Sequence, residues 1–508
     1  MAERPRTLGQ LRASRYPDET VKDEMRRNLM ARLAAHKPLF PGIIGYDDTV
    51  IPMLVNAILS KHDLILLGLR GQAKTRIIRS LVSFLDEAVP IIAGSEVNDH
   101  PYHPVSKYGV DTVREQGDEA PIEWIPREAR YGEKLATPDV TIADLIGDID
   151  PIKAAAQRLH YAHEGVIHFG IIPRTNRGIF AINELPDLQP RIQVGLLNIM
   201  EEKDIQIRGF PVRIPLDVHM VFTANPEDYT NRGNIITPLK DRIGSQIATH
   251  YPHTLEDGIT ITTQEAWITR GDGAKVGVPR VFREIIEQVA VEARHSEYVD
   301  QKSGVSARMT ISSLEALISN VERRALLTNE KTVTPRICDL YAMTPAITGR
   351  LELVYEGEQE GAQKVATALI SRAIRTVYGK YFPLPTAQQR RNPKFSAEKE
   401  QARPSNDDQE YAEIIAWFDM GNTVSLSDRM TEAEYRMALN KVPKLRRVAE
   451  DAKSDLLKDT DISTAMEFVL EGLHAYSQLS KDRLIEGRAV YRDLMSEIFS
   501  SGEETKEW

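Results

Sequence analysis

The stretch Leu64-Ile-Leu-Leu-Gly68-Leu-Arg-Gly-Gln-Ala-Lys74-Thr75 decides the fold of this chain. It joins an apolar strand pattern to a loop with two glycines, and an amphipathic helix pattern follows over residues 76–85. Small residues let backbone N–H groups close around phosphate oxygens, and the positive end of the following helix adds to the attraction. We therefore predict a phosphate-binding loop in which Lys74 reaches the β- and γ-phosphates and the Thr75 hydroxyl binds Mg²⁺.

This loop departs from the common pattern at one position, because Ala73 stands where a second glycine is usual. The alternative interpretation is a tight strand–helix turn that carries Lys-Thr by chance. The candidate nucleotide-binding residues of the loop are Gly68, Arg70, Gly71, Gln72, Ala73, Lys74 and Thr75.

A second motif lies more than a hundred residues further on. Gly178-Ile-Phe-Ala-Ile-Asn183-Glu184 is an apolar strand that ends in two polar residues. Glu184 is placed to activate the attacking water as a base. The carbonyl oxygen of Asn183 can orient a metal-bound water but has no charge, so we expect weak magnesium binding. Alternatively, Asn183 is only a turn residue at the strand end.

Composition places this site in an ordinary globular chain. The 508 residues are 42% hydrophobic and 27% charged, with a net charge of −10, which argues against a general nucleic-acid binder. The single cysteine, Cys338, excludes an intramolecular disulfide and fits a reducing compartment. The apolar stretches are too short to cross a bilayer, so we expect a cytoplasmic protein without a membrane span.

Apolar strand candidates at Leu64–Gly68, Ile179–Ile182 and His219–Thr223 predict an α/β fold with a parallel sheet covered on both faces.

Composition shifts along the chain predict its domain organisation. The expected parts are an N-terminal helical segment (1–40), an α/β core (41–254) with an irregular insertion (about 95–170), an all-helical lid (255–382), a linker (383–408) and a C-terminal helical domain (409–508).

Over roughly residues 38–350, the motifs and their order resemble the AAA+ ATPases of the MoxR and magnesium-chelatase I-subunit branch. Ile43-Ile44-Gly45-Tyr46 is similar to the family's adenine-contacting segment, which implies nucleotide contacts for Ile44 and Gly45. Gly-Gln-Ala-Lys-Thr resembles the loop form common in MoxR proteins. Val221-Phe-Thr-Ala-Asn225-Pro226 is similar to the sensor-1 strand, in which Asn225 would align the attacking water.

The same resemblance implies roles for three arginines. Arg242, in Pro238-Leu-Lys-Asp-Arg242-Ile, resembles an arginine finger that reaches the γ-phosphate bound by a neighbouring subunit. Arg308 resembles sensor 2, which reports the γ-phosphate to the lid. Alternatively, Arg242 is a surface residue paired with Asp241, and Arg308 an ordinary arginine at a helix start. Arg177 is a further residue that could act across the subunit boundary, and the sequence leaves this open.

The resemblance implies an ATP- and Mg²⁺-dependent motor that forms a homo-oligomeric ring of six subunits. Its implied client is a protein with a von Willebrand factor A domain, which the motor would remodel or assemble. The alternatives are a magnesium-chelatase subunit that drives Mg²⁺ insertion into a porphyrin, and an ATP-binding scaffold without hydrolysis. The chain lacks the Gly-Ala-Phe-Thr-Gly-Ala loop and an evident C-terminal helix-turn-helix, which argues against a sigma-54-type activator.

Overall fold

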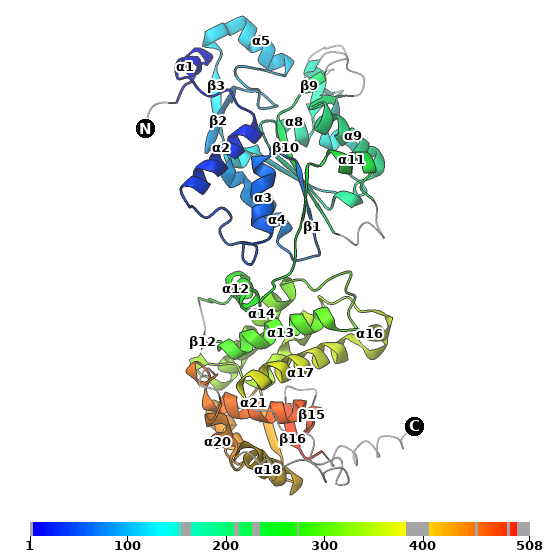
Figure 1. Ribbon diagram of the computed structural model, residues 1–508. Coiled ribbons are helices and arrows are strands. Elements are labelled where there is room, and N and C mark those ends of the chain that lie inside the picture. Colours follow the sequence, from blue (N-terminus) through cyan, green and yellow to red (C-terminus); the bar gives the residue numbers. More distant parts are fainter. Residues whose placement is uncertain are drawn as a thin grey trace. The chain divides into compact units, whose positions relative to one another are not determined.

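The chain divides into two compact units, Met1–Tyr251 and Pro252–Trp508, in the computed structural model (Figure 1). The structure describes residues 4–150, 152–153, 164–207, 213–225, 234–271, 274–382, 406–452, 456–484 and 488–494. Within these ranges, no helix combines the length and the apolar character that a membrane crossing requires.

The first unit is built on a five-stranded sheet in the order β11-β1-β10-β7-β4, and each neighbouring pair in it is parallel. The strands are β1 (Leu64–Leu67), β4 (Tyr131–Leu135), β7 (Gly178–Asn183), β10 (Val218–Ala224) and β11 (Ser245–Ala248). The three predicted strands are β1, β7 and β10, the three central ones. This parallel sheet confirms the predicted α/β fold class.

Helices cover both faces of this sheet, as the apolar strands require. In β1, Leu64 and Leu66 belong to one hydrophobic cluster and Ile65 to the other, because successive side chains point to opposite faces. Helices α2 (Val21–Ala34), α3 (Val50–Leu59) and α4 (Lys74–Ser80) pack on the first face. Helices α9 (Pro190–Glu201) and α11 (Thr237–Arg242) pack on the second, opposite α2–α4 in Figure 1.

The edge strand β4 lies within the range that the sequence predicted as an irregular insertion. Its residues are Tyr, Gly, Glu, Lys and Leu, and it pairs with β7 from Tyr131 to Leu135. Because it is an edge strand beside a Pro- and Gly-rich stretch, it lacks the apolar run that identified the central strands. Residues 154–163 of the predicted insertion lie outside the described residues.

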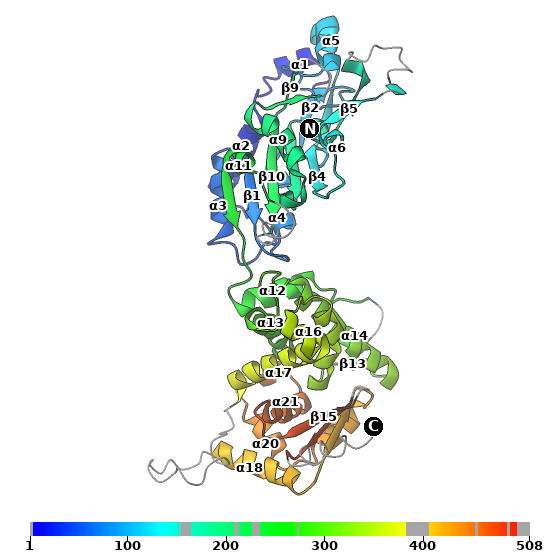
Figure 2. The same ribbon diagram turned by 90° about the vertical axis from the view of Figure 1, so that its right-hand side faces the viewer.

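The remaining elements of the first unit are short. They are α1 (Leu8–Ala13), α5 (Lys107–Gln116), α6 (Ile142–Leu145), α8 (Ile171–Arg174), β2 (Ala88–Ile92), β3 (Ile122–Pro126), β5 (Gly147–Ile149), β6 (Ile167–Phe169), β8 (Asp204–Gln206) and β9 (Arg213–Pro215). Both ribbon views place α1 and α5 at the end of the unit that is far from α4 (Figure 2).

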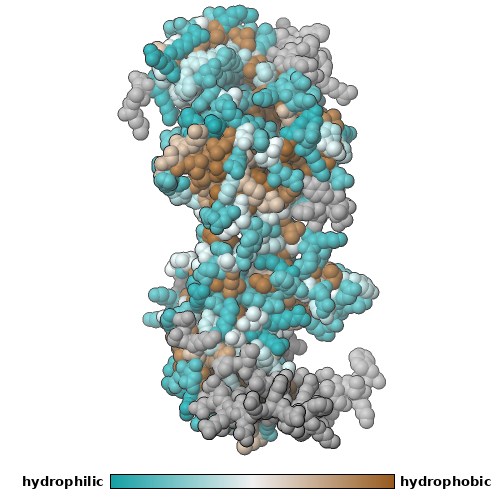
Figure 3. Space-filling model, in the orientation of Figure 1, coloured by the Kyte–Doolittle hydropathy of each residue, from teal (hydrophilic) through white to brown (hydrophobic). Residues whose placement is uncertain are grey.

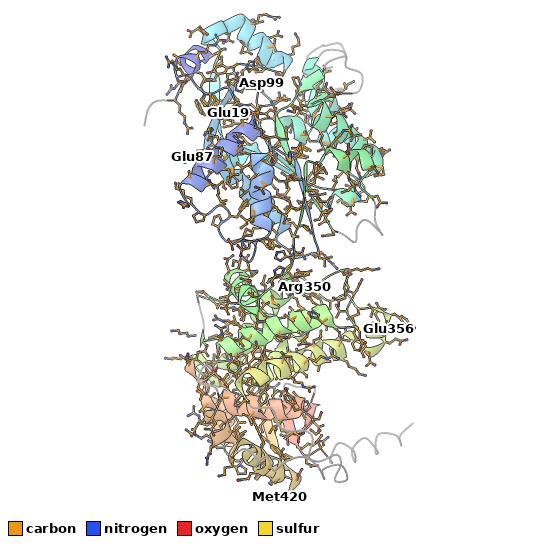
Figure 4. All side chains as sticks on the ribbon, in the orientation of Figure 1. Glu19, Glu87, Asp99, Arg350, Glu356 and Met420 are labelled. Atoms are coloured by element: carbon orange, nitrogen blue, oxygen red, sulfur yellow. The ribbon has the colours of Figure 1, made fainter. Side chains whose placement is uncertain are left out.

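A buried carboxylate, Asp99 (Figure 4), organises the loop before α5. It accepts hydrogen bonds from the backbone N–H groups of Val105 and Ser106, and from the hydroxyl groups of Ser95 and Ser106. Charge-assisted bonds of this number compensate the loss of water around the carboxylate. This part of the predicted insertion is therefore a well-connected loop.

Apolar side chains gather on the outer surface over α2 and α3, where Figure 3 shows a brown area. Met30, Leu33 and Met53 are each at least 40% exposed there. Gathered apolar side chains of this kind are typical of contact surfaces.

The second unit is mainly helical. Its helices are α12 (Leu255–Glu265), α13 (Arg280–His295), α14 (Arg308–Thr328), α15 (Thr344–Thr348), α16 (Tyr355–Glu360), α17 (Ala362–Tyr381), α18 (Asn406–Asp419), α19 (Glu432–Leu439), α20 (Leu445–Glu450) and α21 (Ile462–Ala475). A 3-10 helix, η6 (Ile337–Met343), follows the short parallel pair β12 (Lys275–Val276) and β13 (Thr332–Val333).

The C-terminal region adds a three-stranded antiparallel sheet, in the order β14-β16-β15, to the helices that the sequence predicted there. Its strands are β14 (Val424–Ser427), β15 (Ser480–Leu484) and β16 (Arg488–Arg492). The strands are short and mix polar with apolar residues, so they gave no strand signal. The prediction of a purely helical region was wrong on this point. The predicted linker lies mostly outside the described residues.

One hydrophobic core connects the predicted lid with the C-terminal region. It contains Ile285 of α13 and Leu369 of α17 together with Phe468 of α21 and Tyr491 of β16. Since residues before and after the predicted linker share this core, the second unit folds around a single centre.

Candidate phosphate-binding site

The loop between β1 and α4 is held in place by the segment that follows β11. The Thr249 hydroxyl donates to Gln72 Oε1 at 2.7 Å, and the Tyr251 hydroxyl donates to the Arg70 carbonyl oxygen at 2.9 Å. From the other side, the Tyr46 hydroxyl donates to the Gln72 carbonyl oxygen at 3.0 Å. Tyr46 directly follows the predicted adenine-contacting pair Ile44-Gly45, so the fold brings that segment next to the loop.

Two positions show why the loop needs small residues. A Cβ atom on Gly68 would lie 1.9 Å from Thr249 Oγ1 and 2.1 Å from Gln72 Oε1, so a larger residue there requires a rearrangement. Ala73 precedes the first residue of α4 with a φ of 57°, and Gly71 has a φ of 77°. Such positive φ values favour glycine and cost other residues conformational energy. Ala73 thus occupies a position for which glycine is the usual choice.

The ammonium group of Lys74 is buried inside this loop. It donates to the Gly68 carbonyl oxygen, to the Leu69 carbonyl oxygen at 3.1 Å and to Asn225 Oδ1 at 2.6 Å. Asn225 Nδ2 in turn donates to Glu184 Oε2 at 2.8 Å. The structure therefore brings three predicted residues into one hydrogen-bonded chain at the carboxyl ends of β1, β7 and β10.

The threonine on β10 fixes the end of β7. The Thr223 hydroxyl accepts from the Glu184 backbone N–H at 3.0 Å and donates to Asn183 Oδ1 at 3.3 Å. Glu184 has a φ of 55°, which turns the chain away after the strand. The predicted base and the predicted metal-orienting amide are thus both positioned by the neighbouring strand.

A carboxylate on β4, Glu133, completes this end of the sheet. Asn183 Nδ2 donates to Glu133 Oε1 at 2.6 Å, and Arg79 Nε and the Tyr131 hydroxyl each donate to Oε2 at 2.9 Å. Burial alone would raise the pKa of the Glu133 carboxyl, but the hydrogen bonds from Arg79 and Tyr131 outweigh it and hold that pKa below its usual range. Glu133 is therefore ionised at neutral pH.

The predicted magnesium ligands are chemically suitable. The hydroxyl of Thr75, an exposed residue in the first turn of α4, and the carbonyl oxygen of Asn183 are oxygen donors, which Mg²⁺ prefers. Mg²⁺ commonly keeps several waters and binds through a few protein oxygens plus phosphate oxygens. Among the described residues, no group of three or more His, Cys, Asp and Glu side chains could hold a metal by itself.

The arginines lie in different surroundings. Arg242, at the end of α11, donates through Nε to Glu201 Oε2 at 2.9 Å, so its partner is Glu201 on α9. Arg308 is the exposed first residue of α14, in the second unit. Arg177 is buried and donates to the Pro90 carbonyl oxygen at 2.5 Å, and burial lowers its pKa to about 10. Its side chain is therefore enclosed within the first unit.

The sequence analysis missed Glu133, which contacts Asn183 at the end of β7, and Arg79, which contacts Glu133. Arg79 lies one helical turn after Thr75, and Glu133 lies in the short stretch Tyr131-Gly-Glu-Lys-Leu135. That stretch has neither an apolar run nor a regular alternation, so the sequence offered no strand signal for Glu133. The missed Thr249 shows no local signal, because its role depends only on the approach of β11 to the loop.

No family model matches the chain. Among solved structures, the magnesium chelatase complex of subunits BchI and BchD aligns with a TM-score of 0.33 and 19% identity, over 64% of this chain and 99% of that chain. NtrX from Brucella abortus aligns with a TM-score of 0.33 and 14% identity, over 58% of this chain and 56% of that chain. The ATP complex of NtrX gives a TM-score of 0.36 and 13% identity, over 69% and 66%. Since these TM-scores are low, the fold assignment rests on the sheet and loop described above.

Proposed function

We propose that this protein is an ATP-hydrolysing, ring-forming AAA+ motor, similar to the MoxR and magnesium-chelatase motors. One observation carries the proposal: Lys74, Glu184 and Asn225 come from distant parts of the sequence and meet at the carboxyl ends of three adjacent strands. Ligands of open α/β sheets bind at this edge. The loop supplies N–H groups and a cation for phosphate, and Glu184 supplies a base for water.

The chemistry assigns a role to each residue. Lys74 would exchange its bonds to loop carbonyl groups for bonds to phosphate oxygens, since a triphosphate is the stronger acceptor. Asn225 would orient the attacking water, and Glu184 would take its proton. Mg²⁺, held by Thr75 and carrying a water oriented by Asn183, would neutralise phosphate charge.

The weak ion pair of Arg242 is compatible with the proposed ring. Its ion pair with Glu201 is partly exposed, and exposed pairs contribute only about 0.2–1 kcal/mol. The guanidinium can therefore leave Glu201 for a phosphate of a neighbouring copy at little cost. In the proposed ring of six, each nucleotide lies between two copies and Arg308 reports its state to the helical unit. The proposed client carries a von Willebrand factor A domain, on the basis of the resemblance alone.

The decisive experiment measures ATP binding and phosphate release by the purified full chain. Lys74→Ala should abolish ATP binding, because the loop then loses the ammonium group that it encloses. Glu184→Gln should still bind ATP but release phosphate about 10²–10⁴-fold more slowly, as expected for a lost general base. Lys107→Ala, on α5 at the opposite end of the unit, is the matched control and should behave like wild type.

Two outcomes would contradict the proposal. Undiminished ATP binding by Lys74→Ala would show that this loop does not bind the triphosphate. Phosphate release by wild type that does not exceed that of Glu184→Gln would instead favour the scaffold without hydrolysis, which the neutral Asn183 makes the second candidate.

A further inference from the structure

A chain of hydrogen bonds joins the phosphate-loop helix to the end of β7 through a carboxylate on the edge strand. Arg79 of α4 donates to Glu133 through Nε at 2.9 Å and through a terminal nitrogen at 3.2 Å. Glu133 accepts from Asn183 Nδ2 at 2.6 Å. Its side chain is 21% exposed, so water screens these contacts only partly. Three elements, α4, β4 and β7, thus meet at one carboxylate.

The carboxylate determines the orientation of the Asn183 amide. An ionised carboxylate only accepts hydrogen bonds, so the amide nitrogen must face Glu133. The amide oxygen consequently faces Thr223, whose hydroxyl donates to it at 3.3 Å. A flipped amide would place its oxygen 2.6 Å from a charged oxygen and lose the bond to Glu133, whereas the Thr223 hydroxyl can pair with either end of the amide. The position of the Asn183 oxygen therefore depends on Glu133.

The contact between Glu133 and Asn183 also explains why a neutral residue occupies position 183. An aspartate there would bring two carboxylates to hydrogen-bond distance, and like charges so close cannot both remain ionised. With Asn183 in place, its contact with Glu133 contains one carboxylate and not two, and that carboxylate belongs to the strand β4.

We infer that Glu133 is a positioning residue that orients Asn183 and supplies the negative charge beside its amide, with Arg79 linking both to the helix that follows the phosphate loop. The inference rests on the proposed function for its bearing on Mg²⁺, but the Glu133–Asn183 pairing can be tested without nucleotide. A double variant with the carboxylate at position 183 and the amide at position 133 should restore the hydrogen bond between these two side chains.

The test compares Glu133→Gln, Asn183→Asp and the double variant Glu133→Gln/Asn183→Asp in the full chain. In thermal unfolding without nucleotide, Asn183→Asp should lower the melting temperature by about 4 °C or more, because it sets two carboxylates against each other. The double variant should recover most of that loss, since the amide introduced at position 133 can donate to the carboxylate introduced at position 183. Glu128→Gln, which removes an exposed carboxylate near β4, is the control and should leave the melting temperature unchanged.

Mg²⁺ titrations of ATP binding provide the second readout. The double variant should reach half-maximal binding at about three- to tenfold lower Mg²⁺ than wild type, because it adds charge to the metal-facing oxygen. Asn183→Asp alone should lower the Mg²⁺ concentration for half-maximal ATP binding by a smaller factor. Additive melting shifts, or an Asn183→Asp variant that is stable and equals the double variant, would overturn the inference. If ATP fails to bind at all, the proposed function fails, while the melting comparison still decides the pairing.

Discussion

Two short ion pairs, one in each unit, differ mainly in their burial. Arg242 and Glu201 join α11 to α9 with side chains that are 27% and 53% exposed. Lys481 and Glu471 join β15 to α21 with a contact of 2.6 Å, and each side chain is only 1% exposed. The first pair exchanges readily with water, while the second cannot be solvated unless the unit opens.

The buried pair belongs to a larger balanced network. Glu471 also accepts from the Tyr341 and Tyr491 hydroxyls, both at 2.6 Å, and nearby Glu467 accepts from the backbone N–H of Ile337 at 2.7 Å. Six side chains of the network are at most 2% exposed, three of each charge: Arg324, Arg336, Lys481, Asp339, Glu467 and Glu471. Burial of charge is tolerated only when each charge is paired. The comparison shows that Arg242 can exchange its partner Glu201 for another anion at low cost, whereas Lys481 and Glu471 stabilise the folded unit.

The largest effect is expected on hydrolysis from Arg242→Ala. This variant should bind ATP normally but release phosphate about 10³-fold more slowly or worse, because in the proposed ring the transition state would lose the cation from the neighbouring subunit. Its free energy of unfolding should fall by no more than about 1 kcal/mol. Arg114→Ala, which removes an exposed arginine paired with Asp111, is the control. Wild-type turnover by Arg242→Ala would place the finger elsewhere.

Lys481→Met should instead cause a large loss of stability, which urea unfolding of the full chain would measure. Removing the cation leaves Glu471 charged and buried, which costs about 3–5 kcal/mol. Arg446→Met breaks the exposed Arg446–Glu450 pair in the same unit and should cost less than about 1 kcal/mol. Equal losses in the two variants would show that burial does not separate these two kinds of pair.

A smaller, pH-dependent effect should follow from Glu471. Burial by itself would raise the pKa of this carboxyl, but Lys481 and its other partners lower it to about 2. Since the folded pKa lies below the unfolded one, the stabilisation is complete above about pH 4.5 and is lost as the pH falls toward 2. The stability difference between wild type and Glu471→Gln should thus shrink by about 2 kcal/mol between pH 7 and pH 3. A constant difference would contradict the low pKa of Glu471.

Much of the central sheet was predictable, because its signals are local. The apolar runs at Leu64, Ile179 and His219 identified three buried parallel strands, and the polar residues after them marked the edge that carries the candidate site. The edge strand β4 and the sheet β14-β16-β15 were missed, since short strands with one solvated side lack a continuous apolar run. The connection between the predicted lid and the C-terminal region was also missed, because Glu467 and Ile337 are far apart in the sequence.

The sequence by itself determined where a phosphate could bind and which residues could act on it. Strand, loop and helix signals all lie within residues 64–85, and such local preferences act before any tertiary contact forms. Only the tertiary structure decided which charges meet: Glu133 with Asn183, Arg242 with Glu201, Lys481 with Glu471. The energy of each pair depends on its distance and its exclusion of water, and both are properties of the packed chain.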